Sequence, residues 1–492
     1  MSLDAPWDLW RHAIMTLLGT SSKLLRKGAR PTLLGILLLG ATTALAGCPG
    51  SDTDASDAGT TPPDAAAVDA STTPPVDASA SDGAIFDAST VDASTADATA
   101  DATSDAAAPD GGACGAAAAP TLPSATPDAT FWQPDGEVRA LAWSDDSSKL
   151  VVGGNFTQVK SPDGTMTQSA TNLTVLDATT GQPIAGYPAV TGEIDDISVV
   201  GDTVYVVGGV TQAGGMARTR AFAFSLSSKT VSAWAPTFAG TTPFLPSVRL
   251  VRATPTAIFV GGYFTSAGGA ARTNVAALDP TTGTATAWAP PALGTQAAQD
   301  ITVRALAVAA DRVFVGGGSG IDMTGGDGVR RRNVVALDRT SAALLPWSPV
   351  GITPDSVYAL DVSGDRVVVG RPQSGDLTAP ALFAADTRTG EVCWKTSLGN
   401  AQGFYRAGVA RGVVFGGGLT GTLFTASSSY KAFALGSGSP LTWGGDLFAT
   451  DGSAGTVEDI AVAPNGAVAM TGNRVAKGAL TTGAPKLMVH KP

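Results

Sequence analysis

The sequence predicts an all-β protein in which one short unit repeats seven times and closes into a ring. Three observations predict it. The 492 residues include 60 Gly and 31 Pro, with only 15% charged and 6% aromatic residues, a composition typical of turn-rich β structure. From about residue 130, short apolar runs bounded by turn residues recur. An aromatic residue recurs with them at a mean spacing of about 52 residues, which is in the range of propeller blades. We therefore expect a seven-bladed β-propeller.

The clearest copy of the unit lies between residues 248 and 290. Its apolar runs predict four short strands, with Gly261-Gly262 at the end of the second. Asp279-x-x-Thr-Gly is expected to be a hairpin turn, with Asp capping it and Gly283 supplying a positive φ. The aromatic residues expected to pack between blades from the fourth strands are Trp132, Tyr187, Trp234, Trp288, Trp347, Trp394 and Trp443.

The two ends of the repeat predict how the ring closes. Trp132 lies in an expected fourth strand with no first three strands ahead of it, whereas the last unit ends near residues 486–489 without a fourth. The economical arrangement is an N-terminal strand that completes the C-terminal blade, because closure removes exposed sheet edges. The propeller is then residues 130–492.

The unit also resembles a known family. Residues 260–265 (Val-Gly-Gly-x-Phe-Thr), 272–274 (Arg-x-Asn), 277–279 (Ala-Leu-Asp) and the Trp-x-Pro at Trp288 resemble bacterial delta sixty repeat propellers, most strongly in units 2 to 4. That resemblance implies the fold and no general activity. The tail from residue 277 to Trp288 is distantly similar to quinoprotein blades, and Gly-Gly followed by a distant Trp is similar to kelch repeats. Quinoprotein dehydrogenases typically have eight blades and often adjacent cysteines, which this chain lacks.

Residues 1–47 are expected to be an export signal. Four basic residues between 23 and 30 precede an apolar run at 32–46, which is shorter than the roughly 20 residues needed to span a bilayer. The run ends in Leu45-Ala46-Gly47-Cys48, which resembles a bacterial lipobox. The resemblance implies export by the general secretory route, cleavage before Cys48, and acyl chains on that cysteine that anchor the protein in a membrane. It places the protein at the bacterial cell envelope, on the outer membrane or cell surface. Met1 and Met15 are both candidate starts and leave the same mature protein.

Residues 48–129 are expected to form a disordered stalk. They carry fourteen Asp and no Lys or Arg, in a low-complexity Asp/Ala/Ser/Thr/Pro sequence. Such a segment has too little apolar bulk to bury a core, and its single charge sign keeps it extended. About 80 residues of flexible chain span on the order of 50 Å.

Charge and histidine content exclude several functions for residues 131–492. They carry 26 acidic and 26 basic side chains, and this neutrality argues against a nucleic-acid partner. The whole chain has two His, His12 and His490, so triads and zinc sites built on histidine are not expected. We expect no catalytic residues and no metal or other cofactor, although Asp322 and Asp327 have one alternative interpretation as calcium ligands; an ordinary polar loop is favoured there.

The main candidate site is a ring of residues at corresponding positions near the start of each first strand. It comprises Arg139, Asp195, Arg249, Arg304, Tyr358, Arg406 and Glu458. First strands line the central channel of a propeller, so these side chains should gather at one mouth. Two interpretations stay open: a ring of ion pairs that satisfies itself, or a site for an anionic or sugar-like ligand held by arginine forks.

Two further sets of residues have open alternatives. Arg218, Arg272 and Arg331 share one repeat position, where they either pair or stack inside a blade, for instance with Asp279, or contact a surface ligand. Cys114 and Cys393 either form a disulfide that ties the base of the stalk to the fifth unit, or stay unpaired with Cys393 buried.

We expect the protein to act as a binding or scaffolding module at the cell envelope. Its expected partners are the membrane, through Cys48, and an envelope polysaccharide, peptidoglycan or protein at the channel mouth or upper loops. A propeller enzyme (lyase, hydrolase or quinoprotein-like oxidoreductase) and a purely structural assembly subunit are the alternatives, because propellers host many functions.

Overall fold

The computed structural model describes residues 114–492, except 242–244, 295–302, 319, 372–379, 397–402, 419–429, 446–454 and 475–485. All of these described residues belong to one unit, residues 101–492. The predicted export signal, Cys48 and most of the predicted stalk lie outside them. Within the described part of the chain, no helix is long and apolar enough to cross a membrane.

The described residues form an all-β structure of small antiparallel sheets. Seven larger sheets follow one another along the chain. In chain order their strands are β2 (Glu137–Trp143), β3 (Lys149–Asn155) and β6 (Leu173–Asp177); β8 (Ile194–Val200), β9 (Thr203–Gly208) and β12 (Ala221–Ser225); β14 (Ser247–Ala253), β15 (Ile258–Tyr263) and β18 (Val275–Leu278); β19 (Val303–Val308), β20 (Arg312–Gly317) and β23 (Val334–Asp338); β24 (Ala359–Ser363), β25 (Arg366–Gly370), β26 (Leu382–Asp386) and β27 (Val392–Thr396); β28 (Phe404–Ala410), β29 (Val413–Gly418), β30 (Tyr430–Ala434) and β31 (Pro440–Gly445); and β32 (Gly455–Val462), β33 (Val468–Arg474) and β34 (Leu487–His490).

Four minor sheets, which the sequence did not predict, lie beside the larger ones. They are β1 (Gln133–Pro134) with β4 (Gln158–Lys160) and β5 (Thr167–Ser169); β7 (Val190–Thr191) with β10 (Gln212–Ala213) and β11 (Met216–Ala217); β13 (Phe238–Ala239) with β16 (Ser266–Ala267) and β17 (Ala270–Ala271); and β21 (Asp322–Thr324) with β22 (Arg330–Arg332). Most are built from the hairpin that follows the second strand of a unit.

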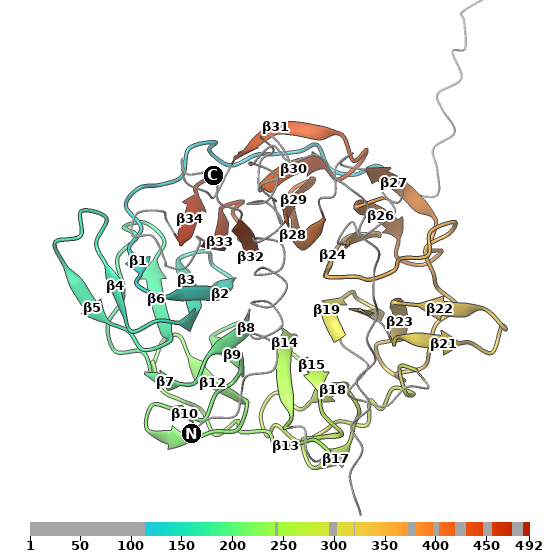
Figure 1. The fold of residues 1–492 in the computed structure, drawn as a ribbon, viewed down its shortest axis with the longest axis horizontal. Coiled ribbons are helices and arrows are strands. Elements are labelled where there is room, and N and C mark those ends of the chain that lie inside the picture. Colours follow the sequence, from blue (N-terminus) through green and yellow to red (C-terminus); the bar gives the residue numbers. More distant parts are fainter. Residues whose placement is uncertain are drawn as a thin grey trace, which may run out of the picture. The chain divides into compact units, whose positions relative to one another are not determined.

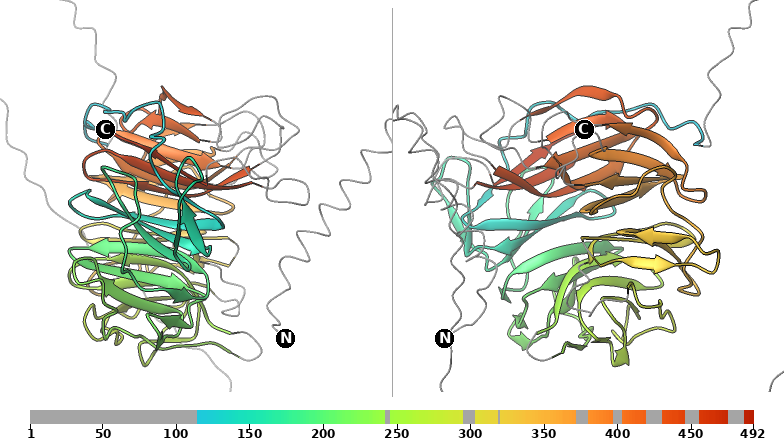
Figure 2. Two further views of the ribbon diagram at one scale, coloured as in Figure 1. Left: turned by 90° about the vertical axis from the view of Figure 1, so that its left-hand side faces the viewer. Right: turned by 45° about the vertical axis from the view of Figure 1, so that its right-hand side comes forward.

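The first strands of the seven larger sheets form a closed cycle. β2 contacts β8, and contacts continue through β14, β19, β24, β28 and β32 back to β2. Figure 1 shows these strands nearest the centre, with the later strands of each sheet farther out. The side views in Figure 2 show the strands of neighbouring sheets running in roughly the same direction.

The core lies between neighbouring sheets. Each apolar cluster combines residues of two successive sheets, and the cluster that closes the cycle joins the first sheet to the last, with Val138 and Leu150 packed beside Ala469 and Val489. Because the sheets are covered on both faces, strands such as β20 and β25 are buried along their whole length.

The predicted fourth strand is complete in two of the larger sheets, as β27 and β31. In four others the expected segment makes only an isolated bridge, for example between Leu278 and Ala285. The difference follows the sequence, because proline cannot donate a ladder hydrogen bond. Proline stands one or two residues after the unit's aromatic residue in those four units, whereas Trp394 and Trp443 are followed by Lys-Thr and Gly-Gly.

The chain closes differently from the prediction. Residues 131–134 do not form a fourth strand of the last sheet; β34 is its outermost strand, and β1 pairs with β4 instead. Segment 124–128 meets β34, where the N–H groups of Ser124 and Asp128 donate to the carbonyls of Lys491 and Val489, both at 2.7 Å.

Residues 131–132 nevertheless link the last unit to the first. The N–H of Trp132 donates to the carbonyl of Gly181 at 3.0 Å. Gly181 has φ 71°, and a Cβ there would lie 2.7 Å from the Cα of Phe131, so this turn requires glycine. The corresponding Gly283 also has positive φ, at 73°, and lies against Pro236 of the preceding unit.

Candidate functional site

The candidate ring is built from β-bulges at the start of the first strands. In β2, Val138 pairs with Gly154 and Ala140 with Gly153, which leaves Arg139 as an extra, unpaired residue. A bulge re-aims the side chain of such a residue. Equivalent bulges place Asp195, Arg249, Arg304 and Glu458 in β8, β14, β19 and β32, and Tyr358 directly precedes β24.

The sixth unit departs from the predicted register by one residue. Phe404 pairs with Gly418 and Arg406 with Gly417, so Tyr405 is the bulged residue and Arg406 is the first residue of the ladder beyond it. The sequence does not distinguish these two residues, because Tyr405 and Arg406 are adjacent and either could be the bulged residue. We call Arg139, Asp195, Arg249, Arg304, Tyr358, Tyr405 and Glu458 the rim ring.

One side of the rim ring is a network of ion pairs around Arg139. Its guanidinium lies 3.0 Å from Glu137, 2.8 Å from Glu193 and 3.3 Å from Asp195. Burial works against the charge of Arg139, but these carboxylates outweigh it and raise the pKa of the guanidinium. Burial and then the charge of Glu193 raise the pKa of Asp195 to about 6, against the attraction of Arg139 and Arg249.

The other side is cationic and aromatic. The guanidinium carbon of Arg304 lies 4.5 Å from the ring centroid of Tyr358, a cation–π arrangement, and Tyr358 meets Tyr405 edge to face at 5.1 Å. Arg406 donates to the backbone carbonyls of Tyr405, at 2.8 Å, and Glu458. We call Arg249, Arg304, Tyr358, Tyr405 and Arg406 the arginine–tyrosine arc.

The arginines of this arc act on carboxylates only from beyond ion-pair distance: the charge of Arg249 works to lower the pKa of Asp195, and that of Arg406 works to lower the pKa of Asp459. Among the described residues, no carboxylate forms an ion pair with Arg249, Arg304 or Arg406. Burial lowers the pKa of Arg304, and the positive charges of Arg249 and Arg406 lower it further, although Tyr358 opposes them. The Nε atom of Arg304 is buried without a hydrogen-bond partner in the structure. Among the described residues, the rim ring therefore has one side where Arg139 is ion-paired and another where the arginines form no ion pair.

A second polar group lies farther along the first strands, and the sequence did not predict it. Asp196 accepts hydrogen bonds from the N–H of Val251 at 2.8 Å and from Arg252 at 2.6 Å. Asp361 accepts the N–H of Val409 at 2.7 Å, and Asp459 accepts the N–H of Leu141 at 2.8 Å. Each carboxylate thus joins its own first strand to the first strand of the next sheet.

These carboxylates are buried in the ring of first strands. Burial raises the pKa of Asp361 and of Asp459 to about 6. Arg252 keeps its proton because the charges of Asp196, Asp459 and Asp361 outweigh the effect of its own burial. The sequence feature that could have identified these carboxylates is an Asp inside an otherwise apolar first strand, as in Ile194-Asp-Asp-Ile197.

The arginines of the shared repeat position fasten the outer part of each unit. Arg272 donates to the carbonyls of Trp288 at 3.0 Å and Thr286 at 2.7 Å, and Arg331 donates to the carbonyl of Trp347 at 2.9 Å. Arg218 donates to the carbonyl of Ser232 at 2.8 Å. Their partners are mainly fourth-segment carbonyls, and the predicted partner Asp279 instead caps its own turn, accepting the N–H groups of Thr281 and Thr282.

The two candidate calcium ligands are engaged by arginines. Asp322 pairs with Arg330 and lies 3.9 Å from Arg332, and Asp327 lies 2.5 Å from Arg331. Within the described ranges, no group of three His, Cys, Asp or Glu side chains is arranged to hold a metal ion.

The aromatic residues of the fourth segments join each unit to the next. Their indole N–H groups donate to turn carbonyls of the following unit: Trp234 to Asp279, Trp288 to Asp338, Trp347 to Asp386 and Trp394 to Leu435. In the sixth unit the indole N–H of Trp443 donates instead to the carbonyl of Ser124, at 3.1 Å.

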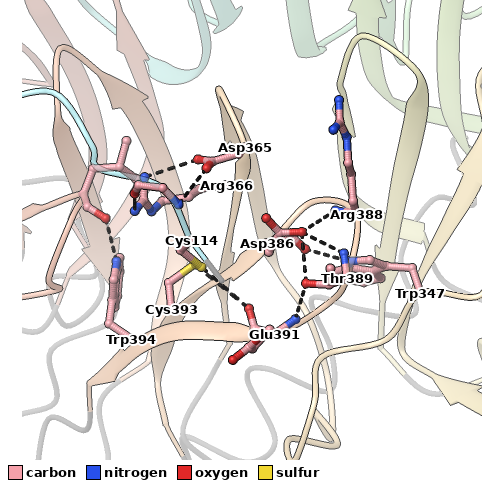
Figure 3. Close-up of a disulfide and its surroundings, with 12 residues drawn as sticks. Cys114, Trp347, Asp365, Arg366, Asp386, Arg388, Thr389, Glu391, Cys393 and Trp394 are labelled. Carbon is pink, nitrogen blue, oxygen red and sulfur yellow. Dashed lines mark hydrogen bonds and ion pairs between the residues drawn. A yellow bond between two sulfur atoms is a disulfide. The ribbon is translucent and has the colours of Figure 1, made fainter. Parts of the chain in front are cut away.

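A disulfide joins Cys114 to Cys393 of β27, with 5.6 Å between their Cα atoms (Figure 3). It is one of the two alternatives that the sequence left open. Nearby, the N–H of Gly115 donates to Asp365 at 3.0 Å, and Arg366 donates to the carbonyl of Gly115. From there residues 114–128, which we call the strap, pass β27, β31 and β34 at the periphery (cyan in Figure 1).

The strap lies at the opposite ends of the first strands from the rim ring. Its contacts include Asp365 and Arg366, in the turn from β24 to β25, and the carbonyl of Arg411, in the turn from β28 to β29, which accepts the N–H of Thr121 at 3.1 Å. The rim ring lies where these first strands begin. These contacts of the strap therefore lie on the side away from the rim ring.

Comparisons with known proteins give no family assignment. No protein-family model and no curated protein matches the chain. Among solved structures, the computationally designed Ika8 protein is 14% identical to it, with a TM-score of 0.42, over 74% of this chain and 98% of that one. A likeness at this level does not establish a shared fold or function.

Proposed function

We propose that this chain is a lipid-anchored, extracytoplasmic seven-bladed β-propeller that serves as a binding or scaffolding module at the bacterial cell envelope. The cyclic order of the seven first strands supports the propeller, as does the packing of the first sheet against the last. The docking of residues 131–132 on the first unit supports closure through the N-terminal segment.

The disulfide supports a location outside the cytoplasm. Disulfides form and persist in oxidising compartments and are rare in the cytosol. The bond between Cys114 and Cys393 fastens the segment that follows the proposed stalk, so it suits a domain exported behind a lipobox. Acylation of Cys48 would then hold the domain at a membrane, with residues 48–113 as the spacer.

The rim ring is the proposed contact surface, and its arginines that pair with no described carboxylate are the observation that carries the proposal. Three guanidinium groups without ion-pair partners among the described residues gather at one end of the ring of strands. The described contacts of the strap lie at the other end of the first strands, so the strap does not cover the rim ring.

A thermal-shift panel on the full chain tests this function. The panel holds peptidoglycan fragments, neutral and acidic polysaccharides, calcium and pyrroloquinoline quinone. A ligand at 100 times its Kd stabilises the folded state by about 2.7 kcal/mol, which is enough to measure. We expect at least one envelope component to raise the Tm, and the shift to vanish when Arg249 and Arg304 are both changed to Ala. A shift produced only by calcium or the quinone, and insensitive to these substitutions, would favour an enzyme instead.

A further inference from the structure

We propose that the arginine–tyrosine arc binds an anionic saccharide, with a carboxylate of the sugar on the arginines and the sugar ring against the tyrosines. The inference rests on the proposed binding role of the rim ring and names the class of ligand that it takes.

The distribution of charge favours an anionic ligand on only one side of the rim ring. Arg139 already contacts three carboxylates, so an anionic ligand on that side of the rim ring would have to compete with them for its guanidinium. On the other side, Arg249 is exposed, and neither it nor Arg304 forms an ion pair with a described carboxylate. An arginine fork binds a carboxylate through two parallel hydrogen bonds, and such charge-assisted bonds are among the strongest in proteins.

Arg304 is the group that the folded protein leaves unsatisfied. Its Nε is buried with no acceptor in the structure, and the positive charges of Arg249 and Arg406 lower the pKa of its guanidinium. An anionic ligand beside this guanidinium would offset the unfavourable effect of two like charges. The cation–π contact with Tyr358 holds the guanidinium in place at 4.5 Å.

The two tyrosines favour a ligand with a ring over a simple anion. Tyr358 and Tyr405 lie edge to face with centroids 5.1 Å apart, and both are partly exposed beside the arginines. Aromatic faces with a few charged groups are typical of sites that bury a small organic ligand. A uronic acid supplies both parts, with a carboxylate for the arginines and the apolar C–H face of a pyranose for a tyrosine ring.

The experiment is isothermal titration calorimetry of the full chain with a tetrasaccharide of galacturonic acid at low ionic strength. Maltotetraose is the neutral control and inorganic phosphate is the control for a simple anion. The variants are Arg304→Gln, Arg249→Gln and Tyr358→Ala. Arg332→Gln is the matched control, because it removes one exposed arginine on β22, away from the arc.

We expect the uronic acid oligomer to bind and maltotetraose and phosphate to bind at least tenfold more weakly. Arg304→Gln and Arg249→Gln should each weaken binding at least tenfold without lowering the Tm by more than a few degrees, and raising the salt concentration from 20 to 200 mM should weaken it several-fold. Arg332→Gln should bind as the natural chain does.

The inference is overturned if the uronic acid oligomer does not bind, if phosphate binds equally well, or if the arginine variants retain full affinity. Binding of maltotetraose with the same affinity also overturns it, but leaves the proposed binding role intact. Failure of the proposed function is a separate outcome, seen when no envelope component in the thermal-shift panel alters the Tm.

Discussion

Replacing Cys114 with Ser should lower the melting temperature of the protein by several degrees. The substitution removes only the covalent link between the strap and β27, since Gly115, Thr121 and Ser124 keep their hydrogen bonds to the sheets. The effect therefore measures how far the cross-link restricts the unfolded chain.

The magnitude follows from the length of the loop that the disulfide closes. Cys114 and Cys393 are 279 residues apart. The chain-entropy relation for a loop of this length gives an upper value of about 5–6 kcal/mol for the loss of unfolding free energy. A domain of about 380 residues unfolds with an entropy of roughly 0.8 kcal/mol per degree, so the Tm should fall by about 7 °C at most and by several degrees in practice.

The assay is differential scanning calorimetry of the natural chain and of Cys114→Ser, each with and without dithiothreitol. Reductant should lower the Tm of the natural chain to that of the variant and leave the variant unchanged. If Cys114→Ser melts within 1 °C of the natural chain, and reductant moves neither protein, the strap is not cross-linked as the structure has it.

Three further variants test the contacts between units and the buried carboxylates. Asn172→Ala should cost about 3 kcal/mol in urea unfolding, because Asn172 accepts the N–H of Phe156 and donates to the carbonyls of Val190 and Gly192 at 2.9–3.0 Å; a loss below 0.5 kcal/mol would refute its role as a link. Trp347→Phe should cost about 2 kcal/mol by the same assay, since it leaves the carbonyl of Asp386 without its indole donor; an unchanged midpoint would contradict this. Asp361→Asn should flatten the pH dependence of stability. Burial raises the pKa of Asp361 in the folded chain to about 6 from 3.8, so the natural chain loses stability as the pH rises from about 4 to about 6. Parallel stability curves of the two proteins between pH 4 and 6 would contradict that cause.

The repeat allowed much of the fold to be predicted from the sequence. Turn residues such as Asp279 and Gly283 occupy the predicted turn, and the tryptophans contact neighbouring units as expected. These features depend on local turn chemistry and on burial of large side chains, both of which are visible in a repeated motif.

Closure of the chain was harder to predict, because it depends on a segment outside the repeat. Residues 133–134 pair with β4, and the hydrogen bonds to the last sheet come from Ser124 and Asp128, in a segment whose composition resembles the stalk. A repeat motif gives no information about a segment that occurs once.

The site was predicted in outline but not in its details. Five of the seven predicted residues lie at bulges of first strands, Tyr358 precedes β24, and in the sixth unit the bulge falls at Tyr405 rather than Arg406. Asp196 and Asp459 both directly follow the bulge of their first strand, whereas Asp361 lies farther along β24. Other units have an apolar residue directly after the bulge, such as Ala140 and Leu250, so the repeat does not mark this position as polar.

The central claim is that this domain works outside the cytoplasm on a lipid anchor, and the N-terminus of the mature protein tests it most directly. Mass spectrometry of the N-terminal peptide, taken from the membrane fraction of a bacterial host, should find Cys48 as the first residue with acyl chains attached, and Cys48→Ala should abolish both the modification and the membrane association. An unmodified peptide that continues from Leu45 through Cys48 in the natural chain would contradict the account.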